Sequence, residues 1–131
     1  MKIKLDLISD RDKNVYSLNE LDAVTPSSAT ELDCGEMLDY SLNRVESLQK
    51  ILTKLRKGGR LIIRGNDLEV TSRLLVNGTI DINRAAQALY GGRINTSSTR
   101  TMVALLNQLG LKIRNVRIDN NIEYLIVAER V

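Results

Sequence analysis

Histidine is absent from this 131-residue sequence, and cysteine occurs only once, as Cys34. A single chain therefore cannot form a histidine–cysteine zinc site, a cysteine–histidine pair or a serine–histidine triad, because each of these needs residues that are missing. Carboxylates alone remain as metal ligands, and we predict no metal site. No neighbour of Cys34 in the sequence would stabilise a thiolate, so we expect a small buried core residue there.

Aromatic residues and long apolar runs are also scarce. The chain has four tyrosines but no phenylalanine or tryptophan, which leaves few side chains on which single-stranded bases could stack. The apolar runs are short, such as those at residues 61–63 and 125–128, and fall far short of the ~20 residues that a membrane-spanning helix needs. The Met-Lys-Ile-Lys start lacks the apolar core of a signal peptide. We expect no membrane segment and a cytoplasmic protein.

The composition is that of one globular domain covering residues 1–131. Hydrophobic residues make up 43% and charged residues 27% of the chain, and both values are close to the average for globular domains. The net charge of +3 allows weak contact with nucleic acid but does not require it, and solvated surface charge is the simpler explanation.

Periodic apolar residues predict an α/β fold. Alternation predicts a strand at residues 2–8, and short apolar runs predict strands at residues 30–34 and 60–64. Residues 42–55 have apolar side chains at intervals of three and four, which predicts a helix with Ser41 as its N-cap. A helix between two strands makes the strands parallel neighbours in one sheet.

Residues that commonly cap helices predict where further helices begin in the rest of the chain. Ser17 and Glu20 have the spacing of a capping box before a short helix. Further helices are expected after Asn66 or Asp67, after Asp81, and after Ser97 or Ser98. The chain should end in an antiparallel hairpin of strands 111–118 and 122–129, joined by the turn Asp119-Asn120-Asn121.

The order of these elements resembles the second half of a class I S-adenosylmethionine-dependent methyltransferase. The resemblance starts with Ser-Ala-Thr-Glu-Leu-Asp at residues 28–33 and Met-Leu-Asp-Tyr at residues 37–40. It continues through the helix to Leu-Arg-Lys-Gly-Gly-Arg-Leu-Ile-Ile at residues 55–63. These segments are similar to the family's fourth strand, its post-strand loop and its glycine-ended fifth strand, and the final hairpin is similar to the last two strands. The resemblance implies a Rossmann-like mixed sheet flanked by helices.

The resemblance also implies a cofactor site, of which only part is present. The family's post-strand loop faces the methyl group and substrate, so Gly35, Glu36, Asp39 and Tyr40 are the candidate cofactor-binding residues. The family has a glycine-rich turn after its first strand and an acidic residue after its second. Here the first strand ends in Asp-Leu-Ile at residues 6–8 without glycine. Too few residues precede position 28 for the family's next helices and strands, so we expect that this half is deleted and that bulky Leu7 and Ile8 would clash with cofactor.

Three functions remain open. The first is a degenerate methyltransferase-like domain that does not bind cofactor alone and acts through self-association or a protein partner. In this interpretation the strand at residues 2–8 is a bare edge that invites homodimerisation. The second is an active S-adenosylmethionine-dependent enzyme whose site is completed by a second chain. The third is a winged-helix-like nucleic-acid module, built from the helix after Ser98 and the hairpin carrying Lys112, Arg114 and Arg117.

Overall fold

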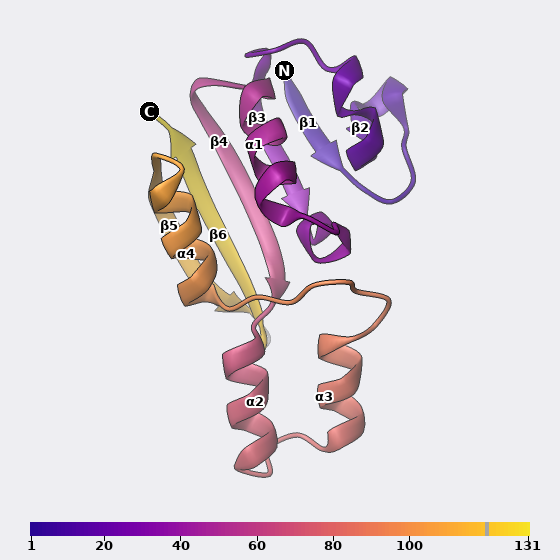
Figure 1. Ribbon diagram of the computed structural model, residues 1–131, viewed down its shortest axis with the longest axis vertical. Coiled ribbons are helices and arrows are strands. Elements are labelled where there is room, and N and C mark those ends of the chain that lie inside the picture. The colour runs from indigo at the N-terminus through magenta and orange to yellow at the C-terminus, as the bar shows by residue number, and fades with distance from the viewer. Residues whose placement is uncertain (120) are drawn as a thin grey trace.

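The computed structural model describes residues 1–119 and 121–131, and Asn120 of the expected turn lies outside the described residues. Six strands form one mixed sheet in the order β2-β1-β3-β4-β6-β5. The strands are β1 (Lys2–Leu5), β2 (Val15–Tyr16), β3 (Ala29–Gly35), β4 (Leu55–Asn66), β5 (Leu111–Asp119) and β6 (Glu123–Arg130). The helices are α1 (Arg44–Lys54), α2 (Leu68–Val76), α3 (Ile82–Leu89) and α4 (Thr99–Gln108), with 3-10 helices η1 (Arg11–Lys13), η2 (Leu18–Ala23) and η3 (Met37–Tyr40). The predicted α/β fold is confirmed (Figure 1).

The core lies between the sheet and the helices α1 and α4. Alternate residues of the strands point into it, and the helices add one apolar stripe each. Leu48 and Ile51 of α1 are completely buried, as are Met102 and Leu106 of α4 to within 1%. Cys34 on β3 is fully buried, as expected, and burial raises the pKa of its thiol.

The first strand is not a bare edge, so this expectation was wrong. β2 pairs with β1 in parallel on its outer side, with Lys4 opposite Val15 and Leu5 opposite Tyr16. The backbone N–H groups of Lys4 and Asp6 donate to carbonyls of residues 14 and 16 at 3.0 Å. A short parallel strand, β2, thus covers the outer side of β1. Sequence patterning could not predict β2, because a strand of two residues has no periodicity.

The length predicted for the first strand was also wrong. β1 ends at Leu5, because the chain turns at Asp6 to bring residues 10–16 back beside the strand. Ile3 and Leu5 are 2% and 1% exposed within the single chain, so they need no cover from a partner. Leu7 and Ile8 lie beyond the strand and are 62% and 82% exposed.

The helix predicted at residues 42–55 begins later. Asn43 caps α1, because its side chain accepts a hydrogen bond from the Glu46 N–H at 3.1 Å. Ser41 instead ends η3, and Leu42 between the two helices is 88% exposed. β4 is longer than expected and includes the Gly58-Gly59 pair. A Cβ at Gly59 would lie 2.8 Å from the Arg56 carbonyl oxygen, so the close approach requires glycine.

The final hairpin belongs to the main sheet. β6 pairs antiparallel with β4 along seven residues, from Arg60 opposite Glu129 to Asn66 opposite Glu123. Tyr124, Leu125 and Ile126 are at most 5% exposed, as suits a strand inside a sheet. An attached hairpin was predicted and is confirmed. It does not form the free, polar wing that a winged-helix nucleic-acid module requires.

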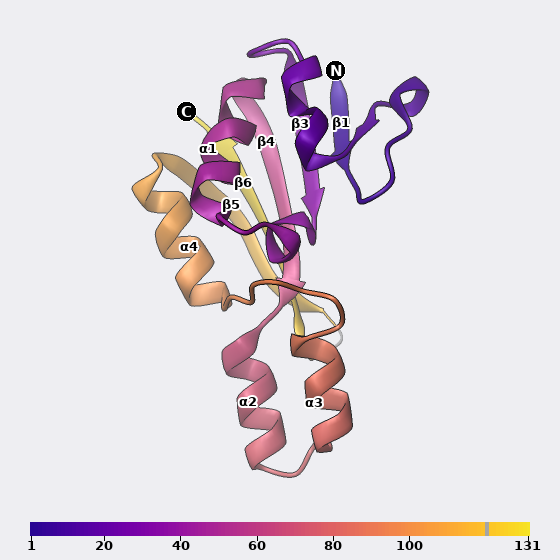
Figure 2. The ribbon, with the colours of Figure 1, turned by 45° about the vertical axis from the view of Figure 1, so that its right-hand side comes forward.

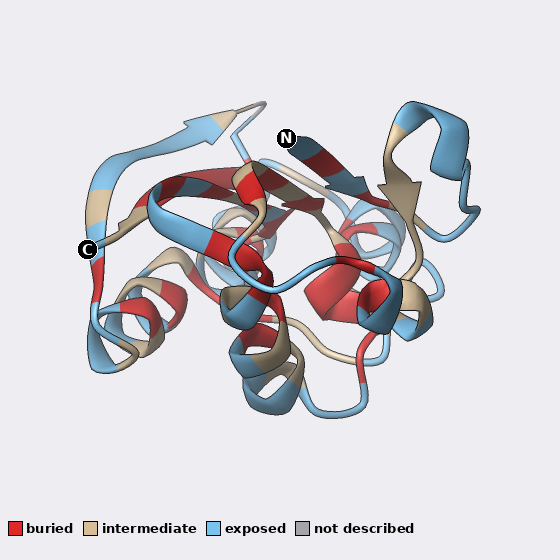
Figure 3. Cartoon of the chain, turned by 90° about the horizontal axis from the view of Figure 1, so that it is seen from above, coloured by how far each residue is buried: buried red, intermediate tan, exposed pale blue. Residues whose placement is uncertain are grey.

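The opposite face of the sheet is covered by no helix in residues 1–119 and 121–131 (Figure 3). A row of alternating charge crosses five strands on this face: Lys2, Glu31, Arg60, Glu129 and Lys112 are successive cross-strand partners. Opposite charges on adjacent strands stabilise each other, and they keep this face in contact with water. Within the same described residues, no helix is long and apolar enough to cross a membrane.

Candidate functional site

A hollow of about 550 Å³ opens at the carboxyl ends of β1, β2 and β3. At this point the chain changes direction in the sheet, because β2 lies on one side of β1 and β3 on the other. Open α/β sheets bind ligands at such switch points, and the volume is in the range of small-molecule sites. The walls come from the segments after the three strands and from the first turns of α1.

The segment after β1 contributes Asp6 and Leu7 to this hollow. The Asp6 carboxylate accepts a hydrogen bond from the Leu7 N–H at 2.7 Å. The Leu7 N–H is therefore already hydrogen-bonded within the chain. In a glycine-rich turn, such an N–H would be free to bind a ligand. The carboxylate also brings negative charge to the end of the strand.

The segment after β2 contributes Ser17 and Asn19. The acidic residue of this segment is Glu20, which forms the predicted capping box of η2. Its carboxylate accepts from the Ser17 N–H at 3.1 Å and from the Ser17 hydroxyl at 2.9 Å, and it pairs with Arg11 at 2.9 Å. These bonds, led by that from the Ser17 backbone, lower the pKa of Glu20 to about 2. An uncharged carboxamide, Asn19, lines the hollow instead.

The segment after β3 contributes Tyr40 and Ser41, and α1 contributes Glu46 and Lys50. The Ser41 and Ser47 hydroxyls lie 2.6 Å apart. Lys50 pairs with Asp22 of η2 at 3.1 Å. The hollow therefore has polar and charged side chains of both signs.

Arg93 binds the acidic residues that follow β3. Its guanidinium lies 3.2 Å from the Glu36 carboxylate and 3.2 Å from that of Asp39, and 6.0 Å from the centre of the Tyr40 ring. The Arg93 side chain is 9% exposed and that of Asp39 is 3% exposed. Burial raises the pKa of Asp39 to about 6, although Arg93 opposes the rise.

The backbone around Arg93 is fixed to the same loop. The Asp39 carbonyl accepts from the N–H groups of Ile94 and Asn95, both at 2.8 Å. Arg44 of α1 donates to the Thr96 carbonyl at 2.8 Å. These bonds hold the connection between α3 and α4 across the carboxyl ends of β3 and β4, as Figure 1 shows.

Tyr124 is a buried polar residue close to this cluster. Its side chain is completely buried, and its hydroxyl has no hydrogen-bond partner among the described residues. Burial first, and then the charge of Asp39, raise its pKa. A Cβ at Gly65 would lie 2.7 Å from the hydroxyl oxygen, so the phenol fits only because residue 65 is glycine.

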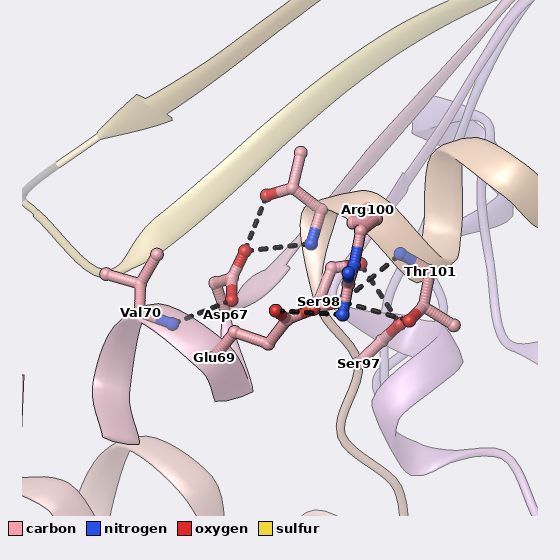
Figure 4. Close-up of polar contacts among 8 residues, drawn as sticks. Asp67, Glu69, Val70, Ser97, Ser98, Arg100 and Thr101 are labelled. Carbon is pink, nitrogen blue, oxygen red and sulfur yellow. Dashed lines mark hydrogen bonds and ion pairs between the residues drawn. The ribbon is translucent and has the colours of Figure 1, made fainter. Parts of the chain in front are cut away.

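Asp67 forms hydrogen bonds to the N-terminal ends of α2 and α4 and to the residue before β6 (Figure 4). One carboxylate oxygen accepts from the Val70 N–H at 3.0 Å and caps α2, while the other accepts from the N–H and hydroxyl of Thr99 at 2.8 and 2.6 Å. The backbone N–H of Asp67 donates to the Ile122 carbonyl at 2.9 Å. Burial opposes ionisation, but the hydrogen bonds, those from Thr99 first, lower the pKa of Asp67.

The structure separates the four residues predicted for the site. Only Tyr40 lines the hollow, whereas Glu36 and Asp39 face Arg93. Gly35 ends β3 with a φ of +52°, and its N–H donates to the Asp33 carboxylate at 2.9 Å. Sequence reasoning missed Arg93, because its partners are more than fifty positions away and no local pattern connects them.

No family model matches the chain, and no curated protein sequence matches it. Solved structures do match. The sheet order, the switch-point hollow and these matches together define a fold of the class I S-adenosylmethionine-dependent methyltransferase type.

Three of these solved structures illustrate the likeness. An S-adenosylmethionine-dependent methyltransferase from Mesorhizobium loti has a TM-score of 0.65 at 15% identity, covering 96% of this chain and 78% of its own. A methyltransferase from Thermotoga maritima, described as a possible histamine N-methyltransferase, has a TM-score of 0.64 at 15% identity, covering 92% and 67%. One from Aquifex aeolicus has a TM-score of 0.63 at 13% identity, covering 91% and 56%. At these identities the likeness shows the fold alone.

Proposed function

We propose that this protein is a degenerate methyltransferase-like domain that does not bind S-adenosylmethionine alone and acts through self-association or a protein partner. The observation that carries the proposal is the end of β1. There the Asp6 carboxylate takes up the Leu7 N–H, where the family's glycine turn would leave backbone N–H groups for the cofactor. Like charges also repel, so Asp6 would oppose the cofactor's own carboxylate.

Two further features support the loss of cofactor binding. The hollow has Asn19 rather than an acid after β2, and a carboxamide offers one acceptor oxygen to a pair of ribose hydroxyls where a carboxylate offers two. Glu36 and Asp39 are already paired with Arg93. Freeing them for a substrate would break two ion pairs in a largely buried setting, which is costly.

An active enzyme with a site completed by a second chain is the second candidate. The hollow at the switch point favours it, because its lining includes three apolar residues that are more than half exposed: Leu7, Leu42 and Ile94. A second chain covering them would exclude water from the hollow. Contact with nucleic acid, if any, is expected to be weak and nonspecific.

Sedimentation of the purified protein with and without S-adenosylmethionine tests the proposal. We expect a species heavier than the 14.7 kDa chain whose mass does not depend on the cofactor. If the cofactor itself drives association, the two-chain enzyme is supported instead. A monomer that binds the cofactor tightly would overturn both candidates.

A further inference from the structure

Helices α2 and α3 form a hairpin that projects beyond the carboxyl ends of the strands (Figures 1 and 2). They have nine and eight residues, and isolated helices of this length are unstable in water. The base is fixed by Asp67 and by a hydrogen bond from the Asn66 amide to the Ala88 carbonyl at 2.8 Å. The Leu68 N–H also donates to the Ser97 carbonyl at 2.8 Å, and Glu69 pairs with Arg100 of α4 at 3.2 Å.

One side of α2 is buried and the other is exposed to solvent. Thr71 is completely buried, and Val70 and Leu74 beside it on the helix are half-buried. Leu68 and Val76 lie on the other side and are 40% and 87% exposed, and Leu75, between the two sides, is 37% exposed. An amphipathic helix in a globular protein normally buries one apolar stripe, whereas this helix has a second stripe in contact with solvent.

The exposed stripe is symmetric about Ser72. This exposed, small residue is the midpoint of α2, and Leu68 and Val76 lie four positions on either side, on the same face. If a second α2 packs antiparallel on the first, Leu68 of each copy meets Val76 of the other. Glu69, which pairs with Arg100 of α4 at 3.2 Å within the chain, and Arg73 lie beside the stripe, and the same arrangement brings Glu69 of one copy near Arg73 of the other.

The open sheet face and the two sheet edges are poorly suited to pairing with a copy. The row of charges on the open sheet face reads the same from either end, so a two-fold axis through it would place like charges opposite each other. One edge strand, β2, has only two residues. The other edge, β5, contains an irregularity between Ile113 and Asn115 and exposes Arg114 and Arg117, which are features that discourage edge pairing.

We propose that a second copy of this chain covers the exposed stripe of α2, in a two-fold dimer with the α2 helices antiparallel and crossing at Ser72. This proposal rests on the self-association proposed above and names the surface responsible. The α2–α3 hairpins of the two copies would form a four-helix arrangement. In it, the exposed apolar stripe of each α2 is buried against the other copy.

Cysteine cross-linking tests this geometry directly. In Ser72→Cys the two new thiols face each other across the two-fold axis, and mild oxidation is expected to give a disulfide dimer within minutes at micromolar protein. Native Cys34 is fully buried and does not compete. The control is Ala104→Cys, which places a thiol on the exposed side of α4 and is expected to cross-link at least tenfold more slowly. Equal rates for the two variants would overturn the crossing at Ser72.

A charge substitution separates this inference from self-association in general. Val76→Lys places a cation at the C-terminal end of α2, where it suits the helix dipole, and it should weaken the dimer at least tenfold in sedimentation equilibrium. Ile8→Lys is the matched control, because Ile8 is 82% exposed outside the hairpin and its variant should dimerise normally. If wild type and both variants dimerise equally, self-association stands and the α2 interface is wrong. If wild type is monomeric at all concentrations, both proposals fail.

Discussion

Two buried carboxylates, Asp39 and Asp67, are 2% and 3% exposed but have opposite pKa shifts. Burial removes water from Asp39 and raises its pKa to about 6, because this effect is larger than the opposing effect of the Arg93 cation. Asp67 accepts several hydrogen bonds that favour its charged form, and its pKa falls. The first carboxylate therefore makes the folded state less stable at neutral pH, and the second makes it more stable.

We predict that Asp39→Asn removes a pH dependence of stability. Between pH ~4 and ~6 the folded protein keeps the Asp39 proton that the unfolded chain has released, so the free energy of unfolding falls as pH rises through this window. The carboxamide of the variant does not titrate. Denaturant unfolding at pH 4 to 7 should show wild type losing stability relative to the variant as pH rises, whereas the exposed Asp12→Asn variant should follow wild type. Parallel profiles for wild type and Asp39→Asn would contradict the expectation.

We predict that Asp67→Ala destabilises the protein by about 2 to 3 kcal/mol, because it removes a cap from α2 and the bonds to Thr99 of α4. Asp81→Ala is the matched control, since Asp81 is exposed and caps α3 alone, and it should cost about 1 kcal/mol or less. In wild type the stabilisation by Asp67 is present above pH ~4 and is lost as pH falls through its lowered pKa. Thermal unfolding of both variants measures the difference, and equal losses would refute the joint-cap role.

At the scale of elements, α1 shows what a local pattern determines. Leu48 and Ile51 are buried as their spacing predicts, because the sheet covers the middle of the helix. Leu42 and Val45 fit the same spacing but are 88% and 40% exposed. Leu42 precedes the helix and lines the hollow, and Val45 lies in the first turn of α1. Periodicity identifies the stripe of a helix, but it does not show how far the covering layer extends.

We predict that Leu48→Ala costs about 2 to 5 kcal/mol of stability, because it leaves a cavity between α1 and the sheet. Val45→Ala in the same helix should cost less than about 1 kcal/mol, since its side chain is already 40% exposed. Urea unfolding of the two variants measures this contrast. A Leu48→Ala loss below about 0.5 kcal/mol would mean that the stripe does not face the core.

For the whole molecule, apolar patterning predicted five of the six strands, and the resemblance implied that they form one mixed sheet with the final hairpin. The sequence did not predict β2 or the Arg93 cluster. β2 is held by hydrogen bonds to β1, and Arg93 reaches carboxylates 54 and 57 positions earlier. Both depend on contacts that form only after the chain has folded, and no short segment of sequence encodes them.

Surface charge leads to a prediction about nucleic acid. Arg114 pairs with Glu129 and Arg117 with Asp119, so cations of the last hairpin are partly neutralised. Binding to duplex DNA should be weak, independent of sequence, and lost as salt rises from about 50 to 200 mM. Fluorescence anisotropy with two unrelated duplexes measures this, and tight binding to only one of them at physiological salt would contradict it.

Calorimetric titration with S-adenosylmethionine tests the central claim most directly. We predict no saturable heat at protein concentrations below or above the self-association range, because Asp6 blocks the end of β1 and Arg93 occupies the acids after β3. Heat that appears only in the associated protein would support a site completed by the second chain. A dissociation constant of about ten micromolar or tighter for the monomer would contradict the claim that this domain has lost its cofactor site.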